Sequence, residues 1–302
     1  MPRPPISLLP ALARVLTSVD AVRNLRALYL LMATFCMAGL WVASARSAVL
    51  HEQALASAMW IGLGLMTAFL GLNATGLLLM DQARGLPVRD PQDALIDALR
   101  CSPRVLLVLG ASLSIAALIA AALVALLWGS RWPWIGPPLL GLVLPVGVLL
   151  LGAALFALVA VVAPLAGPAV WAGQSSAGTL RFLQGRLRHG LPETALLVAT
   201  VYLLAALLTA AVSFIVLSGS RLLAGLAILG AGIELPAQQL MAGVMGWGPR
   251  TLGATGAPLQ GGNLGLAALI GGGAVFALAL VLPTLIYLRG CCAVYLALTA
   301  DE

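Results

Sequence analysis

Six long apolar runs constrain this chain more than any other feature of its sequence. A helix of about 20 apolar residues crosses the hydrocarbon core of a bilayer. The chain is 62% hydrophobic and 9% charged, whereas soluble domains are about 25% charged. Alternating apolar and polar segments, which are typical of membrane barrels, are absent. The sequence therefore predicts an all-α polytopic membrane protein of six transmembrane helices, paired as three hairpins, at 27–45, 56–80, 105–128, 139–163, 195–217 and 264–288.

The distribution of arginine predicts how these helices are oriented. All 16 basic residues are Arg, and a cytoplasmic N-terminus puts twelve of them on the inner side and four on the outer side. The positive-inside rule then places both termini in the cytoplasm, in a bacterial inner membrane. On this interpretation the segment 1–26 and the tail 289–302 are both cytoplasmic. Residues 43–45, Ala-Ser-Ala, resemble a signal-peptidase site, but the basic segment before the first apolar run is 26 residues long. We expect the first span to be retained as a helix.

Three amphipathic segments, 7–26, 90–104 and 175–193, precede the odd-numbered spans. In the second of these, Asp90 is predicted as the N-cap, with Pro91 as the first helical residue and Pro103 closing the helix. Its two faces are predicted to be Leu95, Ala98 and Leu99 on one side and Asp93, Asp97 and Arg100 on the other. We expect interfacial helices along the cytoplasmic surface, with their charges in water. A divalent-cation site of Asp90, Asp93 and Asp97, or a partner-docking surface, is the alternative.

The third segment carries Arg181, Arg186 and Arg188 with no acidic residue before Glu193. These arginines are the predicted contacts for anionic lipid headgroups. The alternative is that they only enforce topology.

Polar groups are sparse inside the spans, and no Asp, Glu, Lys, Arg or His lies in their interiors. This pattern disfavours proton relays and ion-coupled transport. Asn73 is the intramembrane polar candidate, either for a hydrogen bond that packs helices or for contact with a substrate. The glycines of the second span (Gly62, Gly64, Gly71 and Gly76) and Gly271 to Gly273 in the sixth predict close approach of helices.

The longest connection is predicted to be an outer loop at 218–263. It contains a run of 12 apolar residues, 222–233, which is too short to cross the bilayer. Such a run is re-entrant, interfacial or part of a lid over the outer helix ends.

Catalytic and cofactor motifs are not found in the sequence. There is no phosphate-binding loop, nucleophile elbow, zinc-protease helix or dinucleotide fingerprint. The four cysteines and two histidines lack the spacing of a metal site, and no basic face suited to nucleic acid is visible. We therefore predict a protein that is not an enzyme and has no cofactor. Its expected role is that of a scaffold or membrane subunit, with membrane lipids, a protein partner or a second copy as partners. The alternative is a permease or lipid-handling transporter whose cavity is capped by 218–263.

Two stretches carry a resemblance to a known group. They are "DQARGLPVRDPQDALIDALR" (81–100), before the third span, and "APLAGPAVWAGQSSAGTLRFLQGRLRHGLPE" (163–193), before the fifth. This arrangement resembles bacterial six-helix membrane proteins related to the glycerophosphoryl diester phosphodiesterase membrane domain. The resemblance implies a fold with short interfacial helices before alternate spans. It implies no functional residues, because the phosphodiesterase activity of that group belongs to a separate catalytic domain.

Overall fold

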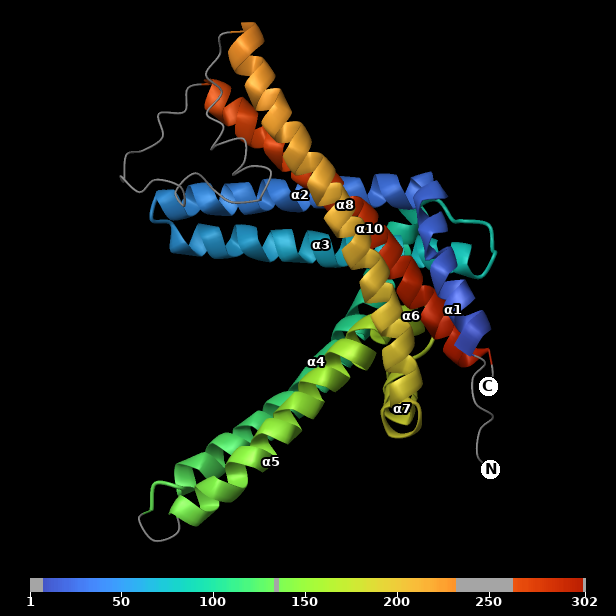
Figure 1. The fold of residues 1–302 in the computed structure, drawn as a ribbon, viewed down its shortest axis with the longest axis vertical. Coiled ribbons are helices and arrows are strands. Elements are labelled where there is room, and N and C mark those ends of the chain that lie inside the picture. Colours follow the sequence, from blue (N-terminus) through green and yellow to red (C-terminus); the bar gives the residue numbers. More distant parts are fainter. Residues whose placement is uncertain (1–7, 133–135, 232–262, 301–302) are drawn as a thin grey trace. The chain divides into compact units, whose positions relative to one another are not determined.

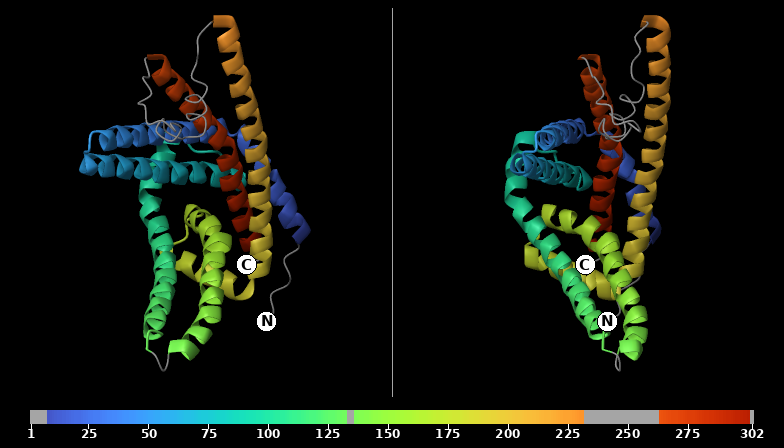
Figure 2. Two further views of the ribbon diagram at one scale, coloured as in Figure 1. Left: turned by 60° about the vertical axis from the view of Figure 1, so that its left-hand side comes forward. Right: turned by 90° about the vertical axis from the view of Figure 1, so that its left-hand side faces the viewer.

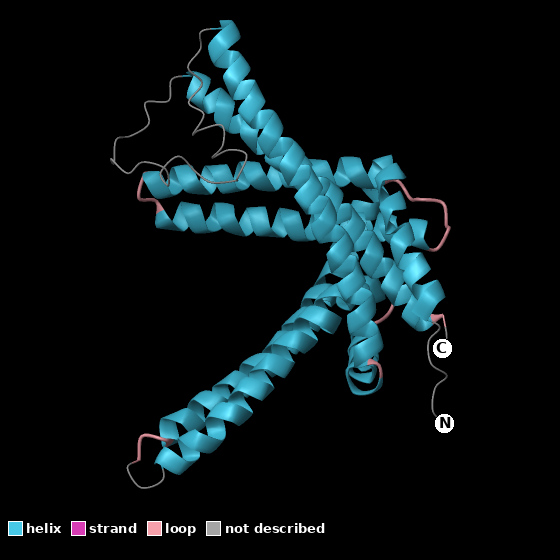
Figure 3. Ribbon diagram, viewed as in Figure 1, coloured by secondary structure: helices cyan, strands magenta, loops and turns pink. Residues whose placement is uncertain are grey.

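A computed structural model describes residues 8–132, 136–231 and 263–300. Throughout these residues the chain forms helices and connecting turns, without a strand (Figure 3). Six helices are long and apolar enough to cross a membrane. The chain is therefore a multi-pass membrane protein of the all-α class, as predicted.

The elements follow one another along the chain as helices of very different length. In order they are α1 (Leu8–Leu16), a 3-10 helix (Thr17–Arg23), α2 (Leu25–Leu50), α3 (Ala54–Ala83), α4 (Pro91–Gly129), α5 (Gly136–Ala157), a π-helical turn (Leu158–Val162), α6 (Ala163–Trp171), α7 (Ser176–His189), α8 (Leu191–Ala231) and α10 (Asn263–Thr299) (Figure 1).

Three of the predicted boundaries are wrong. Helix α4 does not end at Pro103 but runs through it, with the loss of the backbone hydrogen bond that proline cannot donate. Helix α8 continues through the first part of the expected outer loop, to Ala231, since that stretch lacks proline and is apolar from Leu222 onward. Helix α10 continues past Arg289 to Thr299, where a tail was expected. The remainder of the expected loop, 232–262, lies outside the described residues.

The chain divides into two compact units. Unit 1 contains residues 1–18, 76–201 and 288–302, and unit 2 contains residues 19–75 and 202–287. Ten of the twelve largest fully buried side chains in the described residues belong to unit 1. Unit 1 thus holds most of the tightly packed interior.

The interior of unit 1 is built where long helices end and short ones begin. It contains Leu78 and Met80 at the end of α3, Leu165 in α6, Leu197 at the start of α8 and Leu298 at the end of α10. Helix α4 packs against α6 and α7. The buried face of α4 consists of small residues at helical spacing, namely Ala94, Ala98, Ser102, Val105 and Val108.

Two glycines allow close contacts inside unit 1. A Cβ atom on Gly76 would lie 2.4 Å from ring atoms of Trp171, and one on Gly290 would lie 2.7 Å from Val201. The indole of Trp171 therefore lies against the backbone of α3. The expected role of Gly76 in close helix approach is confirmed.

Unit 2 contains α2, most of α3 and parts of α8 and α10. Helices α2 and α3 run side by side (Figures 1 and 2), with the rings of Trp41 and Trp60 stacked at 5.2 Å between centroids. Gly71 faces Thr34, whose side chain would collide with any Cβ at that position. In contrast, a Cβ atom on Gly62, Gly271 or Gly273 would meet no described atom within 4 Å, so the predicted close approach is not seen there.

A shift in hydrogen bonding separates α5 from α6. The N–H of Ala163 bonds to the carbonyl of Leu158, five residues earlier, in the π-helical turn. Pro164 follows directly and has no N–H to donate, so the regular ladder cannot continue unchanged through this point. Pro164 and Pro168 thus lie within α6 and do not end the helical path.

We expect Gly76→Ala to destabilise the protein by about 1 to 3 kcal/mol, because the added methyl group overpacks the contact with Trp171. Gly62→Ala in the same helix is the matched control. It meets open space and should be neutral or stabilising by up to about 1 kcal/mol through helix propensity. Unfolding in mixed detergent micelles, followed by tryptophan fluorescence, measures both. Equal behaviour of the two variants would contradict the packing.

Candidate functional site

The connection between α3 and α4 is the most highly charged part of unit 1. Helix α3 ends in a turn at Gly85, whose φ of +69° is left-handed. The N–H of Leu86 bonds to the carbonyl of Asp81 at 3.0 Å, and that of Gly85 to Gln82 at 3.2 Å. This pair of bonds is a Schellman motif, which glycine favours because it has no Cβ. The chain is thereby reversed so that residues 86–90 pass back beside the end of α3.

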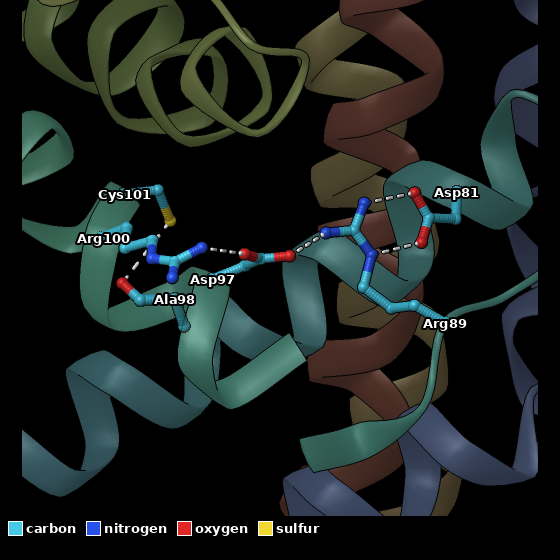
Figure 4. Close-up of polar contacts among 6 residues, drawn as sticks. All are labelled: Asp81, Arg89, Asp97, Ala98, Arg100 and Cys101. Atoms are coloured by element: carbon cyan, nitrogen blue, oxygen red, sulfur yellow. Dashed lines mark hydrogen bonds and ion pairs between the residues drawn. The ribbon is translucent and has the colours of Figure 1, made fainter. Parts of the chain in front are cut away.

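The reversal brings Arg89 against two carboxylates from different helices (Figure 4). Its Nε and Nη2 atoms donate to Asp81 Oδ2 at 2.6 Å and Oδ1 at 2.8 Å, and its Nη1 atom donates to Asp97 Oδ2 at 2.8 Å. The planar guanidinium matches both oxygens of Asp81 at once. We call Asp81, Arg89 and Asp97 the ion-pair cluster.

Burial differs across the ion-pair cluster. The Asp81 side chain is 9% exposed, that of Arg89 31% and that of Asp97 40%. The hydrogen bond with Asp81 is the main cause that raises the pKa of Arg89 above its ordinary, already basic value, while burial acts in the opposite direction. The ion-pair cluster therefore favours the charged form of Arg89. A carboxylate as buried as Asp81 needs such a partner, since an unpaired charge there would be costly.

A cavity of about 680 Å³ adjoins the ion-pair cluster. It is lined by Asp81, Leu86, Pro87, Arg89, Asp93, Ile96, Asp97 and Arg100. Arg100 approaches Asp97 only at 3.5 Å, and its side chain is 77% exposed. Ionic and apolar groups therefore meet on the same open surface.

The connection between α6 and α7 repeats this construction. Gly173 has a φ of +96°. The N–H of Gln174 bonds to Ala169 at 3.1 Å and that of Gly173 to Val170 at 2.9 Å, which forms a second Schellman motif. Ser175 then caps α7 by accepting a hydrogen bond from Gly178 N. Arg84 Nη2 donates to the carbonyl of Ala172 at 3.1 Å, so the two turns are joined.

Arg186 lies inside unit 1, although it was predicted to face lipid headgroups. Its residue is 7% exposed, and Nη2 donates to the carbonyl of Leu298 in the last turn of α10. The guanidinium carbon lies 5.4 Å from the centroid of the Phe182 ring, which in turn meets Tyr295 edge-on. Arg186 falls on the buried face of α7 with Thr179 and Leu183, because these positions share one side of a helix. The prediction for Arg186 is therefore wrong, whereas Arg181 and Arg188 are exposed.

The other predicted site residues are distributed as follows. Asn73 is 3% exposed, and its amide donates to the carbonyl of Phe69, one turn earlier in α3, at 2.9 Å. Asp90 does occupy the N-cap of α4, with Pro91 after it, but its side chain makes no capping bond. Asp97 pairs with Arg89 and not with a divalent metal ion. Among the described residues, no three Asp, Glu, His or Cys side chains are arranged to hold a metal ion. Of the predicted apolar face of 90–104, Ala98 is buried, whereas Leu95 and Leu99 are exposed.

Sequence reasoning missed the ion-pair cluster. Two signals could have found it. Asp81 directly follows an apolar run, at the edge where a carboxylate needs a partner. The Arg84-Gly85 pair marks the end of a helix, after which the chain can return with Arg89. Neither signal tells which of Arg84, Arg89 and Arg100 is the partner of Asp81, since that depends on the geometry of the turn.

No family model, curated protein or solved structure matches the chain. The geometry of the site is therefore the guide to what it can do.

We expect Asp81→Asn to destabilise the protein by about 2 kcal/mol, because Arg89 loses its bidentate partner in a mostly buried place. Combining it with Arg89→Gln should cost less than the sum of the single variants, since the two side chains interact directly. The exposed pair Asp20–Arg23 is the matched control, with side chains 51% and 83% exposed. Arg23→Gln should change stability by less than about 0.5 kcal/mol. Additive losses in the double variant would contradict the pairing.

Arg186→Gln is expected to cost about 2 kcal/mol of stability, because the charged hydrogen bond to Leu298 and the contact with Phe182 are lost. Arg188→Gln, two residues away on the exposed side, should cost less than about 0.5 kcal/mol. Unfolding in mixed micelles compares them. If both variants unfold alike, Arg186 is not a structural residue.

Proposed function

We propose that this protein is a non-enzymatic scaffold or membrane subunit that assembles with other components of a bacterial inner membrane. On this proposal the arginine-bearing connections of unit 1 and both chain ends face the cytoplasm. The six spans cross the bilayer as three hairpins.

One observation carries the proposal. Only 11% of the most apolar window of α4 is buried within the chain, and the corresponding share is 22% for the helix that spans α5 and α6. Large side chains such as Leu118 and Leu149 are 70% and 73% exposed. These exposed apolar surfaces are suited to contact with lipid and with neighbouring transmembrane helices.

The ion-pair cluster supports the same proposal. Arg89 uses three donor atoms on two carboxylates, and Arg84 and Arg186 hold the carbonyls at helix ends. These charges hold the helix ends of unit 1 together. Among the described residues of the site they leave no activated nucleophile next to a general base, which a catalytic site requires. The permease alternative depends on a cavity capped by 218–263, of which 232–262 lies outside the described residues.

Anionic lipid is the further partner that we propose, now at Arg181 and Arg188 on the exposed side of α7. Each juxtamembrane arginine contributes about 1 kcal/mol to the attraction of an anionic surface. Arg186 takes no part because its guanidinium is buried.

Purification in mild detergent, followed by native mass spectrometry, tests this assembly. We expect a second protein chain, different or identical, at a fixed stoichiometry, with anionic lipid that is depleted in the Arg181→Gln/Arg188→Gln double variant. A Cβ atom on Gly110, Gly141 or Gly152 would meet no described atom within 4 Å, so we expect the fold to accept Leu at these positions. At least one of these three variants should lose the protein partner while unfolding as the wild type does. A lone monomer in every preparation would contradict the scaffold proposal.

A further inference from the structure

The cavity beside the ion-pair cluster has a charge pattern of its own. It is an open surface depression of about 680 Å³, large enough to hold a small ligand or a headgroup. Three carboxylates and two guanidiniums line it, which gives a formal charge of −1. Leu86 and Ile96, which are 51% and 50% exposed, add apolar surface. A ligand that fits must carry a positive group. Arg100, the lining arginine outside the ion-pair cluster, can accommodate a negative group.

The charges of the lining fall into two groups. Asp81, Arg89 and Asp97 are engaged with one another in the ion-pair cluster. On the open side, Asp93 is exposed and forms no ion pair within the described part of the chain, and Arg100 reaches Asp97 only at 3.5 Å. Asp93 and Asp97 are one helical turn apart, so their Cβ atoms are separated by about 6 Å. Arg100 follows in the next turn, which places a carboxylate pair next to a guanidinium.

The cavity lies at the level of the membrane surface. Asp81 directly follows the apolar run 56–80, and the end of such a run marks the edge of the hydrocarbon core. Because Arg89 joins Asp81 to Asp97, the part of α4 around Asp97 is held within side-chain reach of that edge. Headgroups of the bilayer occupy this layer.

We propose that this cavity binds the headgroup of an aminophospholipid, with phosphatidylethanolamine as the chemical type. The primary ammonium lies between Asp93 and Asp97, the phosphate lies on Arg100, and the glycerol end contacts Leu86 and Ile96. The charge of −1 disfavours a headgroup that is only anionic, which separates this site from Arg181 and Arg188. The binding does not depend on whether the chain assembles with other subunits.

Competition between two lipids tests the proposal. The full-length protein is incubated in mixed micelles with equal amounts of phosphatidylethanolamine and phosphatidylglycerol of identical acyl chains, and the retained lipids are quantified by native mass spectrometry. We expect a preference of about fivefold for phosphatidylethanolamine, the size of effect that a partly exposed ion pair gives. Asp93→Arg changes the lining charge from −1 to +1 and should reverse the preference toward phosphatidylglycerol.

Two controls separate this site from others. Arg104→Gln, on an exposed residue outside the cavity lining, and the Arg181→Gln/Arg188→Gln double variant should both leave the retention of phosphatidylethanolamine unchanged. Should Asp93→Arg fail to fold, Asp93→Asn replaces it and should reduce the preference by at least about twofold. Equal retention of the two lipids by the wild type, or a preference that Asp93 variants do not alter, would overturn the proposal. Loss of a protein partner bears only on the scaffold function.

Discussion

Lipid offers no hydrogen-bond partners, and this single constraint organises the whole chain. Every backbone group within the bilayer must find its partner inside the same segment, which leaves helices as the solution for apolar runs of this length. Charged side chains are then confined to the connections between helices and to the helix ends beside them. In unit 1, four aspartates and four arginines lie within residues 81–104, from the end of α3 to the first turns of α4. The crowding of charge there is thus a consequence of its exclusion elsewhere, and it creates a second requirement, that the charges pair.

The arginines meet that requirement in two different ways. Arg89 neutralises carboxylates, whereas Arg84 and Arg186 donate to carbonyls at the C-terminal ends of α6 and α10. The carbonyls at a helix C-terminus lack partners within the helix and carry the negative end of its dipole, so a guanidinium there is doubly favourable. The same arginines also contribute to the charge bias from which the orientation in the membrane is predicted. A count of arginines predicts orientation, but it does not distinguish an arginine that faces lipid from one that holds two helices together.

The sequence was sufficient for the features that depend on composition and was insufficient for those that depend on contact. Six spans follow from apolar length alone, and the close approach at Gly71 and Gly76 follows from the size of glycine. The helix break expected at Pro103 and the earlier ends expected for α8 and α10 are not found, because a single proline or arginine is tolerated inside a helix. Arg186 was misassigned for a related reason. Arg181, Arg186 and Arg188 look equivalent along the chain, and only the position of Thr179 and Leu183 on the buried face of α7 shows that Arg186 shares it.

The two connections of unit 1 use one backbone plan with opposite electrostatics. Both begin with a Schellman turn at glycine, and both lead into a helix with Asp or Ser at its N-cap. The first presents a cavity with a formal charge of −1, and the second presents two exposed arginines on α7. The hydrogen bond from Arg84 to Ala172 joins the first turn to the second, so the two surfaces lie close together within unit 1. The lipid sites proposed for the two surfaces therefore differ in charge, since the first suits a headgroup that carries an ammonium and the second suits an anionic one.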